Sequence, residues 1–388
     1  MIERIWRALL APLMAAAAAI LISSVALLVS GNNPVEAFRE MWKVIDSTAS
    51  VVIIINAAVP LYISGVAVAI GFKMNLFNIG SNGQFLLAAL FAGWAGAEVS
   101  LPPPIHVTFV IVVALGVGGL WALIAAILNV TRNVNVVIST IMLNYIAIGV
   151  SAFLLSEFFR AEGTGLVAQT KEMPASAQLP ALNKLIELTG FNFAPGVELY
   201  GFLPIAIALG IGYYVLLNRS RFGYDLRLSG LNAEAARSAG VNPNRMVLIT
   251  LFLSGAIAGM IGLPYLISDP DFLKYGDAFP TMIGFTGLGL ALLGRNHPVG
   301  IAAAAIVWAT IERATQRLGP IGIPPEIGRI LQGSFLLSAV IAYEVVRRRN
   351  DAAAAAAAAA ATGQRADASG DSTASLDDVE ARIDRTRW

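Results

Sequence analysis

The stretch LFNIGSNGQFLLAAL, residues Leu76 to Leu90, decides the fold because an apolar helix begins in it among polar residues. Its second half suits a membrane helix, but its first turns carry Asn78, Ser81, Asn82 and Gln84 among glycines. A buried amide or hydroxyl without a partner costs about 2 kcal/mol or more, so these side chains must face protein, water or a cargo rather than lipid. The stretch therefore predicts an interrupted helix that lines an internal cavity.

The composition places the chain among polytopic membrane proteins. Its 388 residues are 57% hydrophobic and 13% charged, and the mean hydropathy is +0.71. The net charge of +1 gives no reason to expect a nucleic-acid partner. Cysteine is absent, and His106 and His297 stand without neighbouring ligands, so no metal site and no catalytic constellation is expected. We predict an all-α protein that is not an enzyme.

Ten apolar segments are long enough, or nearly so, to cross a bilayer, which needs about 20 residues per helix. They cover residues 8 to 29, 51 to 71, 79 to 99, 104 to 129, 136 to 156, 200 to 218, 247 to 268, 281 to 294, 299 to 318 and 328 to 346. Arginine and lysine are densest in alternate connections, so the positive-inside rule predicts that both termini are cytoplasmic.

The last part of the chain differs in composition from the rest. Residues 351–388 begin with an alanine run and continue in Ser, Asp, Arg and Gly without apolar periodicity. Such a sequence cannot bury enough apolar surface to fold alone. We therefore predict a transmembrane domain over residues 1–350 and a disordered cytoplasmic tail over residues 351–388.

A short pattern recurs in the two halves of the chain. Ile79-Gly80-x-x-Gly83-x-x-Leu86 opens the third span, and Ile283-Gly284-x-x-Gly287-x-x-Leu290 opens the eighth. A Ser-Gly pair lies in the span before each of them, at residues 64–65 and 254–255. Spans that are five apart run in opposite directions, so the recurrence of this pattern predicts an inverted repeat of five plus five helices.

The long cytoplasmic loop from 219 to 245 contains a short helix with its own signals. Asn232 can cap the helix, Glu234 lies in its first turn and can pair with Arg237, and Gly240 ends it. Its apolar side consists of Leu231, Ala235, Ala236 and Ala239. Such small side chains let another protein approach closely, so the helix suits docking; an ordinary interfacial connector is the alternative. A second short helix is expected in the outer loop, over residues 181–190.

Three of these stretches resemble motifs of one transporter family. GFKMNLFNIGSNGQFLLAAL, residues 71–90, resembles the FNIGxEGQ signature of ABC importer permeases of the nucleoside and simple-sugar branch, and VVISTIMLNYIA, residues 136–147, resembles their MLNYIA element. Residues 234–240 resemble the EAAxxxG core of the helix that couples such permeases to their ATPases. The usual glutamate of the signature is Asn82 here, which puts in doubt any role that needs a negative charge.

The resemblance implies partners that the chain's own residues do not reveal. It implies a second homologous permease subunit, a cytoplasmic ATP-binding subunit, an extracytoplasmic substrate-binding lipoprotein, and a place among the lipids of a bacterial cytoplasmic membrane. The sequence has no GxxxxGK[ST] phosphate loop, so ATP and Mg²⁺ are expected in the partner and no cofactor in this chain. The residues that the coupling helix would use are Asn232, Glu234, Ala235, Ala236, Arg237 and Gly240.

The cargo is inferred from the neutral polar side chains of the predicted cavity. Amides and hydroxyls without charges favour nucleosides, with simple sugars such as pentoses as the alternative. An ion-coupled secondary transporter and a passive channel are further alternatives, although no chain of buried acids suggests a proton relay. The expected substrate pathway consists of Asn75, Phe77, Asn78, Ser81, Asn82, Gln84, Asn144 and Tyr145. For Asn144 and the aromatic residues, packing between helices is the alternative role.

Overall fold

The computed structural model describes residues 2–163, 167–188, 190, 193–324, 326–339, 341–342, 345 and 348. The chain forms two compact units, one of residues Val25–Gln332 and one of Met1–Ser24 with Gly333–Trp388. Within the described ranges the regular structure is entirely helical, apart from a single bridge between Gln169 and Gly276. The predicted tail over residues 351–388 lies outside the described residues.

The helices begin and end close to the predicted segments. They are α1 (Ile2–Val29), α2 (Pro34–Trp42), η1 (Lys43–Asp46), α3 (Thr48–Phe72), α4 (Ser81–Glu98), α5 (Pro103–Arg132), α6 (Val136–Glu157), η2 (Ala175–Ala177), α7 (Asn183–Glu187), α8 (Leu203–Asn218), α9 (Arg221–Leu231), α10 (Ala233–Ser238), α11 (Pro243–Gly259), η3 (Met260–Gly262), α12 (Leu263–Ile267), α13 (Ile283–Leu293), α14 (Pro298–Gln316) and η4 (Gly319–Ile321). Residues 326–339 are also helical. A helix therefore stands at each of the ten predicted segments.

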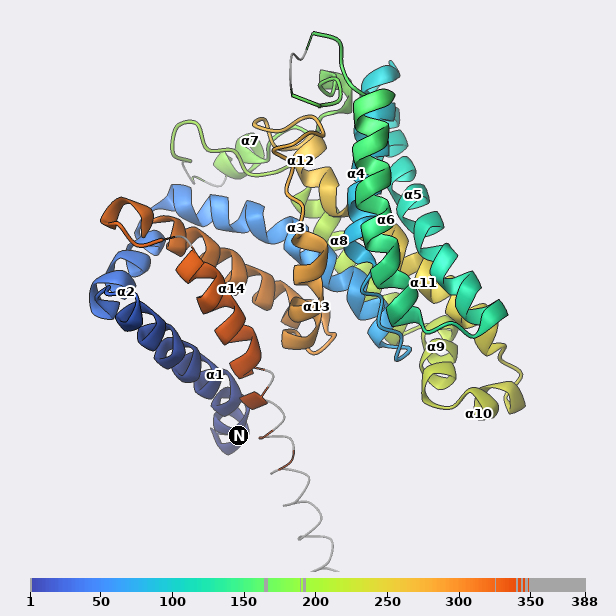
Figure 1. The fold of residues 1–388 in the computed structure, drawn as a ribbon, viewed down its shortest axis with the longest axis horizontal. Helices are drawn as coiled ribbons and strands as arrows, with labels where there is room; N and C mark the ends of the chain where they lie inside the picture. Colours follow the sequence, from blue (N-terminus) through green and yellow to red (C-terminus); the bar gives the residue numbers. More distant parts are fainter. Residues whose placement is uncertain are drawn as a thin grey trace, which may run out of the picture. The chain divides into compact units, whose positions relative to one another are not determined.

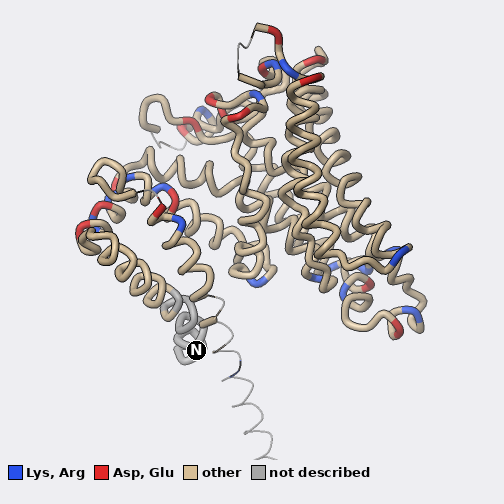
Figure 2. Tube along the Cα trace, viewed as in Figure 1, with Lys and Arg blue, Asp and Glu red and all other residues tan. Residues whose placement is uncertain are grey.

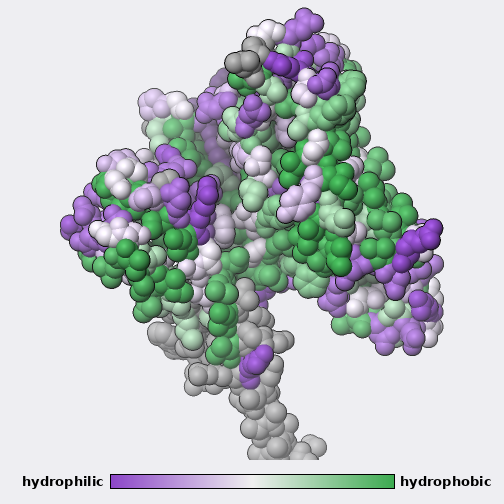
Figure 3. Space-filling view, viewed as in Figure 1, coloured by the Kyte–Doolittle hydropathy of each residue, from purple (hydrophilic) through white to green (hydrophobic). Residues whose placement is uncertain are grey.

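Four helical segments of the described chain are long and apolar enough to cross a membrane. They are α3, α5, α6 and the stretch Pro243–Ile267, and the pair α8 and α9, bent by 65°, would make a fifth. Among the other predicted spans, Ala16–Val29 of α1 and the helix α13 are apolar but shorter. Figure 2 shows that Lys, Arg, Asp and Glu gather in the connecting segments, while the long helices are almost free of charge. Figure 3 shows the apolar face that α5 and α6 expose, which includes Leu120, Ile138 and Met142.

Local capping explains where several helices begin and end. The side chains of Asn135 and Asn242 accept hydrogen bonds from Val137 N and Arg245 N, so they cap α6 and α11. Asn133 ends α5 in a left-handed conformation, with φ of 52°. The outer helix α7 is shorter than predicted, at five residues. Leu185 in this helix and Leu188 just after it are exposed.

Two similar sets of contacts hold the larger unit together. Helix α5 packs along α11, and α14 packs along α3; α4 contacts α11, and α13 contacts α3 (Figure 1). Helices α5 and α11 can approach closely because glycine has no Cβ at their contact points. A Cβ on Gly118 would collide with the carbonyl of Gly255, and a Cβ on Gly259 would collide with that of Ala114. The core beside α4 and α3 contains Ile63, Phe85 and Leu90, all fully buried.

Candidate functional site

The beginnings of α4 and α13 meet inside the larger unit. The Ser81 hydroxyl donates a hydrogen bond of 2.8 Å to the carbonyl of Gly284. Gly284 lies so close to the backbone of Asn82 that a Cβ would not fit. The Ser64 hydroxyl, on α3, donates to the carbonyl of Ile283 over 2.9 Å. The two segments that share the recurring sequence pattern are therefore neighbours in space.

The second Ser-Gly pair makes the corresponding contact on the other side. The Ser254 hydroxyl, on α11, accepts a hydrogen bond of 2.9 Å from the Asn78 amide and donates one of 2.7 Å to the carbonyl of Ala67. Ser64 contacts the start of α13, and Ser254 contacts the segment before α4. Each serine thus holds the interrupted segment of the opposite half of the chain.

Most of the predicted pathway amides are bonded to protein. The side chains of Asn78 and Gln84 exchange two hydrogen bonds of 2.9 and 3.0 Å. The Asn144 amide accepts from Gly83 N over 2.7 Å and donates to the carbonyl of Ile79 over 2.8 Å. All three side chains are buried. They brace the start of α4, because they bind its backbone and one another.

Asn82 differs from these amides because neither its Nδ2 nor its Oδ1 has a hydrogen-bond partner, although the residue is fully buried. Leaving such a group unsatisfied costs about 1–3 kcal/mol. Asn82 lies on the wall of a cavity of about 350 Å³. The cavity is lined by Asn82, Leu86, Ile148, Ser151, Ala152, Leu155, Tyr275, Gly276, Asp277, Thr281 and Met282. Among the residues predicted for the pathway, Asn82 therefore combines an unpaired buried amide with a position on the wall of a cavity.

The connection between α6 and α8 holds one wall of this cavity. Thr170 N donates to the carbonyl of Tyr275 over 2.8 Å, and Tyr275 N donates to the Thr170 hydroxyl over 3.1 Å. Burial, with a smaller contribution from the charge of Asp277, raises the pKa of Tyr275 to about 12. The phenol is therefore neutral at physiological pH, and Asp277 is the one charged residue among the described residues that line the cavity.

Three of the residues predicted for the pathway lie away from the cavity. The Tyr145 side chain is exposed on the outside of α6. The Phe77 ring is half exposed and contacts Phe72, with the ring centroids 5.0 Å apart. Asn75 is exposed in the connection between α3 and α4, where its amide donates to the carbonyl of Gly230 over 2.9 Å. Of the predicted set, Asn82 is the residue that lines the cavity.

Sequence reasoning did not select Ser151, Tyr275, Asp277 or Thr281, which complete the polar lining. They come from α6 and from the connection between α12 and α13, so no motif or spacing groups them with Asn82. The one available signal was the position of Ser151 on α6. It lies seven residues, two helical turns, after Asn144 and so falls on the same face.

The predicted surface helix is present as α10, at the end of the molecule where Figure 2 shows the charges of α9 and α10. Asn232 caps it by accepting hydrogen bonds from Glu234 N and Ala235 N, and Gly240 follows it with φ of 80°. Glu234 and Arg237 form no ion pair in the structure, so that part of the prediction was wrong.

The exposed surface of α10 suits contact with another protein. Leu231, just before α10, is 80% exposed, and Ala235 is exposed, while Ala236 faces inward and is buried. Just after α3, burial and the charge of Arg227 lower the pKa of Lys73. A protruding leucine beside small alanines offers a partner one apolar anchor on an otherwise closely approachable helix.

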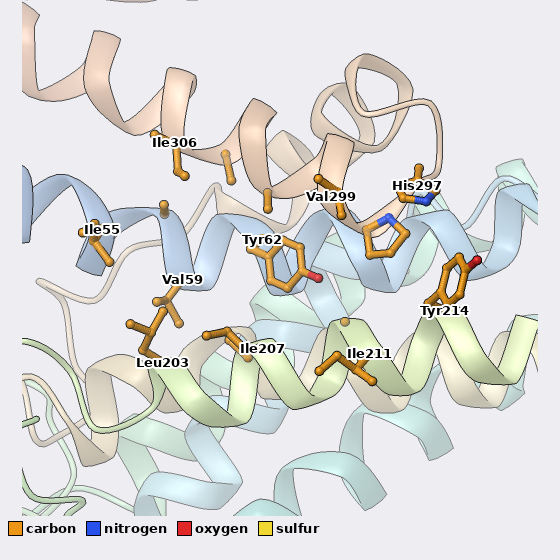
Figure 4. A pocket seen from close by; sticks show the side chains of 16 residues that line it. Ile55, Val59, Tyr62, Leu203, Ile207, Ile211, Tyr214, His297, Val299 and Ile306 are labelled. Carbon is orange, nitrogen blue, oxygen red and sulfur yellow. The ribbon is translucent and has the colours of Figure 1, made fainter.

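A second cavity of about 640 Å³ lies between α3, α8 and α14 (Figure 4). Apolar side chains such as Val59, Ile207 and Ile306 form most of its wall. Its polar groups come from Tyr62, Tyr214 and His297. This lining fits an apolar chain better than a hydroxylated cargo, and none of the predicted pathway residues contributes to it.

Comparison with known proteins gives consistent matches along the chain. The family described as "Branched-chain amino acid transport system / permease component" matches residues 50–340. The chain is 30% identical to the glucose ABC transporter permease protein of Haloferax volcanii, over 86% of this chain and 88% of that protein. It is 29% identical to the guanosine ABC transporter permease protein NupP of Bacillus subtilis, over 87% and 94%. It is 26% identical to the nucleoside ABC transporter permease protein NupB of Lactococcus lactis, over 87% and 92%. No solved structure matches it.

Proposed function

This chain belongs to the permease component family of branched-chain amino acid transport systems, and from that premise we propose that it is the membrane-spanning subunit of an ABC importer of nucleosides. It is a transport subunit and a multi-pass protein of the cytoplasmic membrane. The relatives named for guanosine and nucleosides support this cargo. The relative named for glucose supports the alternative, a simple sugar.

The observation that carries the cargo assignment is the unpaired Asn82 amide in a small, largely neutral cavity. At about 350 Å³ the cavity is at the lower end of the range of ligand pockets, about 300–1,000 Å³, so it suits one small molecule. The Asn82 amide offers both donors and an acceptor, which match the edge of a nucleobase or a pair of hydroxyls. Asp277 at the cavity would repel a phosphate, so the proposed cargo is the nucleoside rather than its phosphorylated form.

The arrangement of the helices is proposed to be an inverted repeat of five plus five spans with both termini cytoplasmic. The reciprocal contacts of Ser64 and Ser254 support it, as does the packing of α5 on α11 and of α14 on α3. In this arrangement the cavity lies between the halves, where rocking of one half against the other would open it to each side in turn.

The partners are proposed from the same family. ATP and Mg²⁺ would be bound by a cytoplasmic ATPase that docks on α10, through Asn232, Glu234, Ala235, Ala236, Arg237 and Gly240. A lipoprotein would deliver the cargo to the outer face. A second permease subunit is supported by the pair NupP and NupQ, both named guanosine ABC transporter permeases of Bacillus subtilis. This chain is 24% identical to NupQ over 65% of this chain's length.

The cargo assignment is tested with the reconstituted importer in vesicles. Radiolabelled adenosine should accumulate with ATP present and stop when ATP is depleted while the ion gradient is held. Accumulation that persists without ATP would contradict the ABC mechanism. Accumulation of a pentose without adenosine would replace the nucleoside by the sugar.

Two variants separate a pathway amide from a packing amide. Asn82→Leu should lower adenosine uptake about tenfold at normal abundance, because the loss of a hydrogen bond worth about 1.4 kcal/mol changes an equilibrium tenfold. Gln84→Leu should instead lower abundance and melting temperature, because it removes both hydrogen bonds between Gln84 and the Asn78 amide in a buried site. Unchanged uptake by Asn82→Leu would mean that Asn82 does not contact the cargo.

A further inference from the structure

The hydroxyl of Ser151 is the second buried polar group of the cavity without a partner. Ser151 is buried, its Oγ makes no hydrogen bond, and it lines the same cavity as Asn82. Serine and threonine in a helix commonly bond back to a carbonyl one turn earlier. On the same helix, Thr140 does so to the carbonyl of Val136 over 2.8 Å. The Ser151 hydroxyl is therefore left available to the cavity.

The two unpaired groups come from neighbouring helices with fixed relative positions. Asn82 lies in the first turn of α4, and Ser151 lies on the face of α6 that also carries Asn144. Asn144 binds the backbone on both sides of Asn82, at Gly83 N in α4 and at the carbonyl of Ile79 just before α4. This bracing fixes α6 against the start of α4. The cavity thus presents an amide and a hydroxyl from a rigid frame rather than from a mobile loop.

We propose that Asn82 and Ser151 together determine cargo specificity, by binding a neutral molecule that presents hydroxyl or ring-nitrogen groups to both of them. The proposal rests on the proposed function and adds Ser151 as a specificity-determining residue. A site whose buried polar groups wait for the cargo rejects an analogue that lacks the matching group, because that analogue would leave them unpaired. A cargo of nucleoside size reaches both groups, since the cavity holds about 350 Å³.

The test measures uptake by the complete importer of adenosine and of its 2′-, 3′- and 5′-deoxy analogues. Ser151→Ala should lower adenosine uptake about tenfold and lower uptake of one deoxy analogue much less, because that analogue no longer uses the hydroxyl. Asn82→Ala should single out a different group of the cargo. Ser139→Ala is the matched control, since Ser139 is on α6 and buried, but its hydroxyl already bonds to Asn135 O and Val136 O.

The outcomes separate this proposal from the proposed function. An equal loss for adenosine and every analogue, or no loss at all in Ser151→Ala, would overturn the role of Ser151 in specificity. If the wild-type importer accumulates ribose and not adenosine, the nucleoside assignment fails, and deoxyribose analogues take the place of the deoxyadenosines in the same comparison. The melting temperature of each purified variant shows whether a loss of uptake comes from misfolding, and a Ser151→Thr variant, which keeps the hydroxyl, should retain the preference.

Discussion

The side-chain amide of Asn75 donates a hydrogen bond of 2.9 Å to the backbone carbonyl of Gly230 and so ties the segment before α4 to the end of α9. Gly230 lies against the backbone of Met74 with no space for a Cβ. Helix α10 follows α9 directly, so a displacement of α10 would reach the beginning of α4 through this bond. Asn75, expected in the substrate pathway, instead links the segment before α4 to the helix that precedes α10.

We predict that Asn75→Ala uncouples ATP hydrolysis from uptake. ATPase activity of the complex should persist while adenosine uptake falls about tenfold, because the loss of the bond to Gly230 loosens α9 and α10. The control is Asn133→Ala. Asn133 is also exposed and left-handed, with φ of 52° against 57° for Asn75, so both variants carry the same backbone strain. Equal effects of the two variants would reduce the role of Asn75 to its backbone conformation.

Changes on the exposed side of α10 should weaken binding of the ATPase without affecting membrane insertion. In Glu234→Lys the charge at the start of the helix is reversed, and in Leu231→Glu the apolar anchor is removed. Both should lower recovery of the ATPase with the purified permease while the abundance of the permease stays normal. Gly240→Arg should act in the same direction. The φ of 80° at Gly240 disfavours any residue with a side chain, and the substitution places a bulky side chain beside the docking surface. Full recovery of the ATPase with all three would rule out α10 as its docking helix.

The meeting of α4 and α13 should be intolerant of a single added methyl group. Gly284→Ala places a Cβ against the backbone of Asn82, and overpacking of this kind costs about 1–3 kcal/mol. The melting temperature should fall, and uptake should fall with it. Gly149→Ala is the control, because Gly149 is a helical glycine with no atom within 4 Å of the added Cβ. Alanine there should be neutral or stabilising. A similar response of both variants would contradict the close contact at Gly284.

The outer side of the molecule should become less stable as the pH rises. Burial raises the pKa of Asp269, which accepts a hydrogen bond from the Tyr200 hydroxyl. A raised pKa in the folded state means that folding favours the protonated acid. Its contribution to stability is present below the ordinary pKa of 3.8 and is lost as the pH rises through the raised value. Asp269→Asn mimics the protonated form, so its melting temperature relative to wild type should increase from pH 4 to pH 7. A constant difference across that range would show that Asp269 does not titrate in this way.

The sequence alone determined the features that depend on neighbouring residues. Helix starts and ends follow from caps such as Asn232 and Asn242, and apolar runs mark the helices, because capping and burial act within a few residues. The family was also recognisable in the FNIG segment of residues 71–90 and in the MLNYIA element of residues 136–147. These local signals gave a helix at each predicted segment and placed the surface helix at α10.

The tertiary structure alone decided which polar side chains find hydrogen-bond partners within the protein. Asn78, Gln84 and Asn144 look the same in sequence as Asn82, but the first three find partners within the protein and Asn82 does not. Hydrogen-bond pairing depends on groups that are tens or hundreds of residues away, such as Ser254 for Asn78 and Gly230 for Asn75. Composition and spacing therefore predicted a polar cavity, while only the packing of α4 against α6 and α13 showed that Asn82 and Ser151 line it without hydrogen-bond partners in the protein.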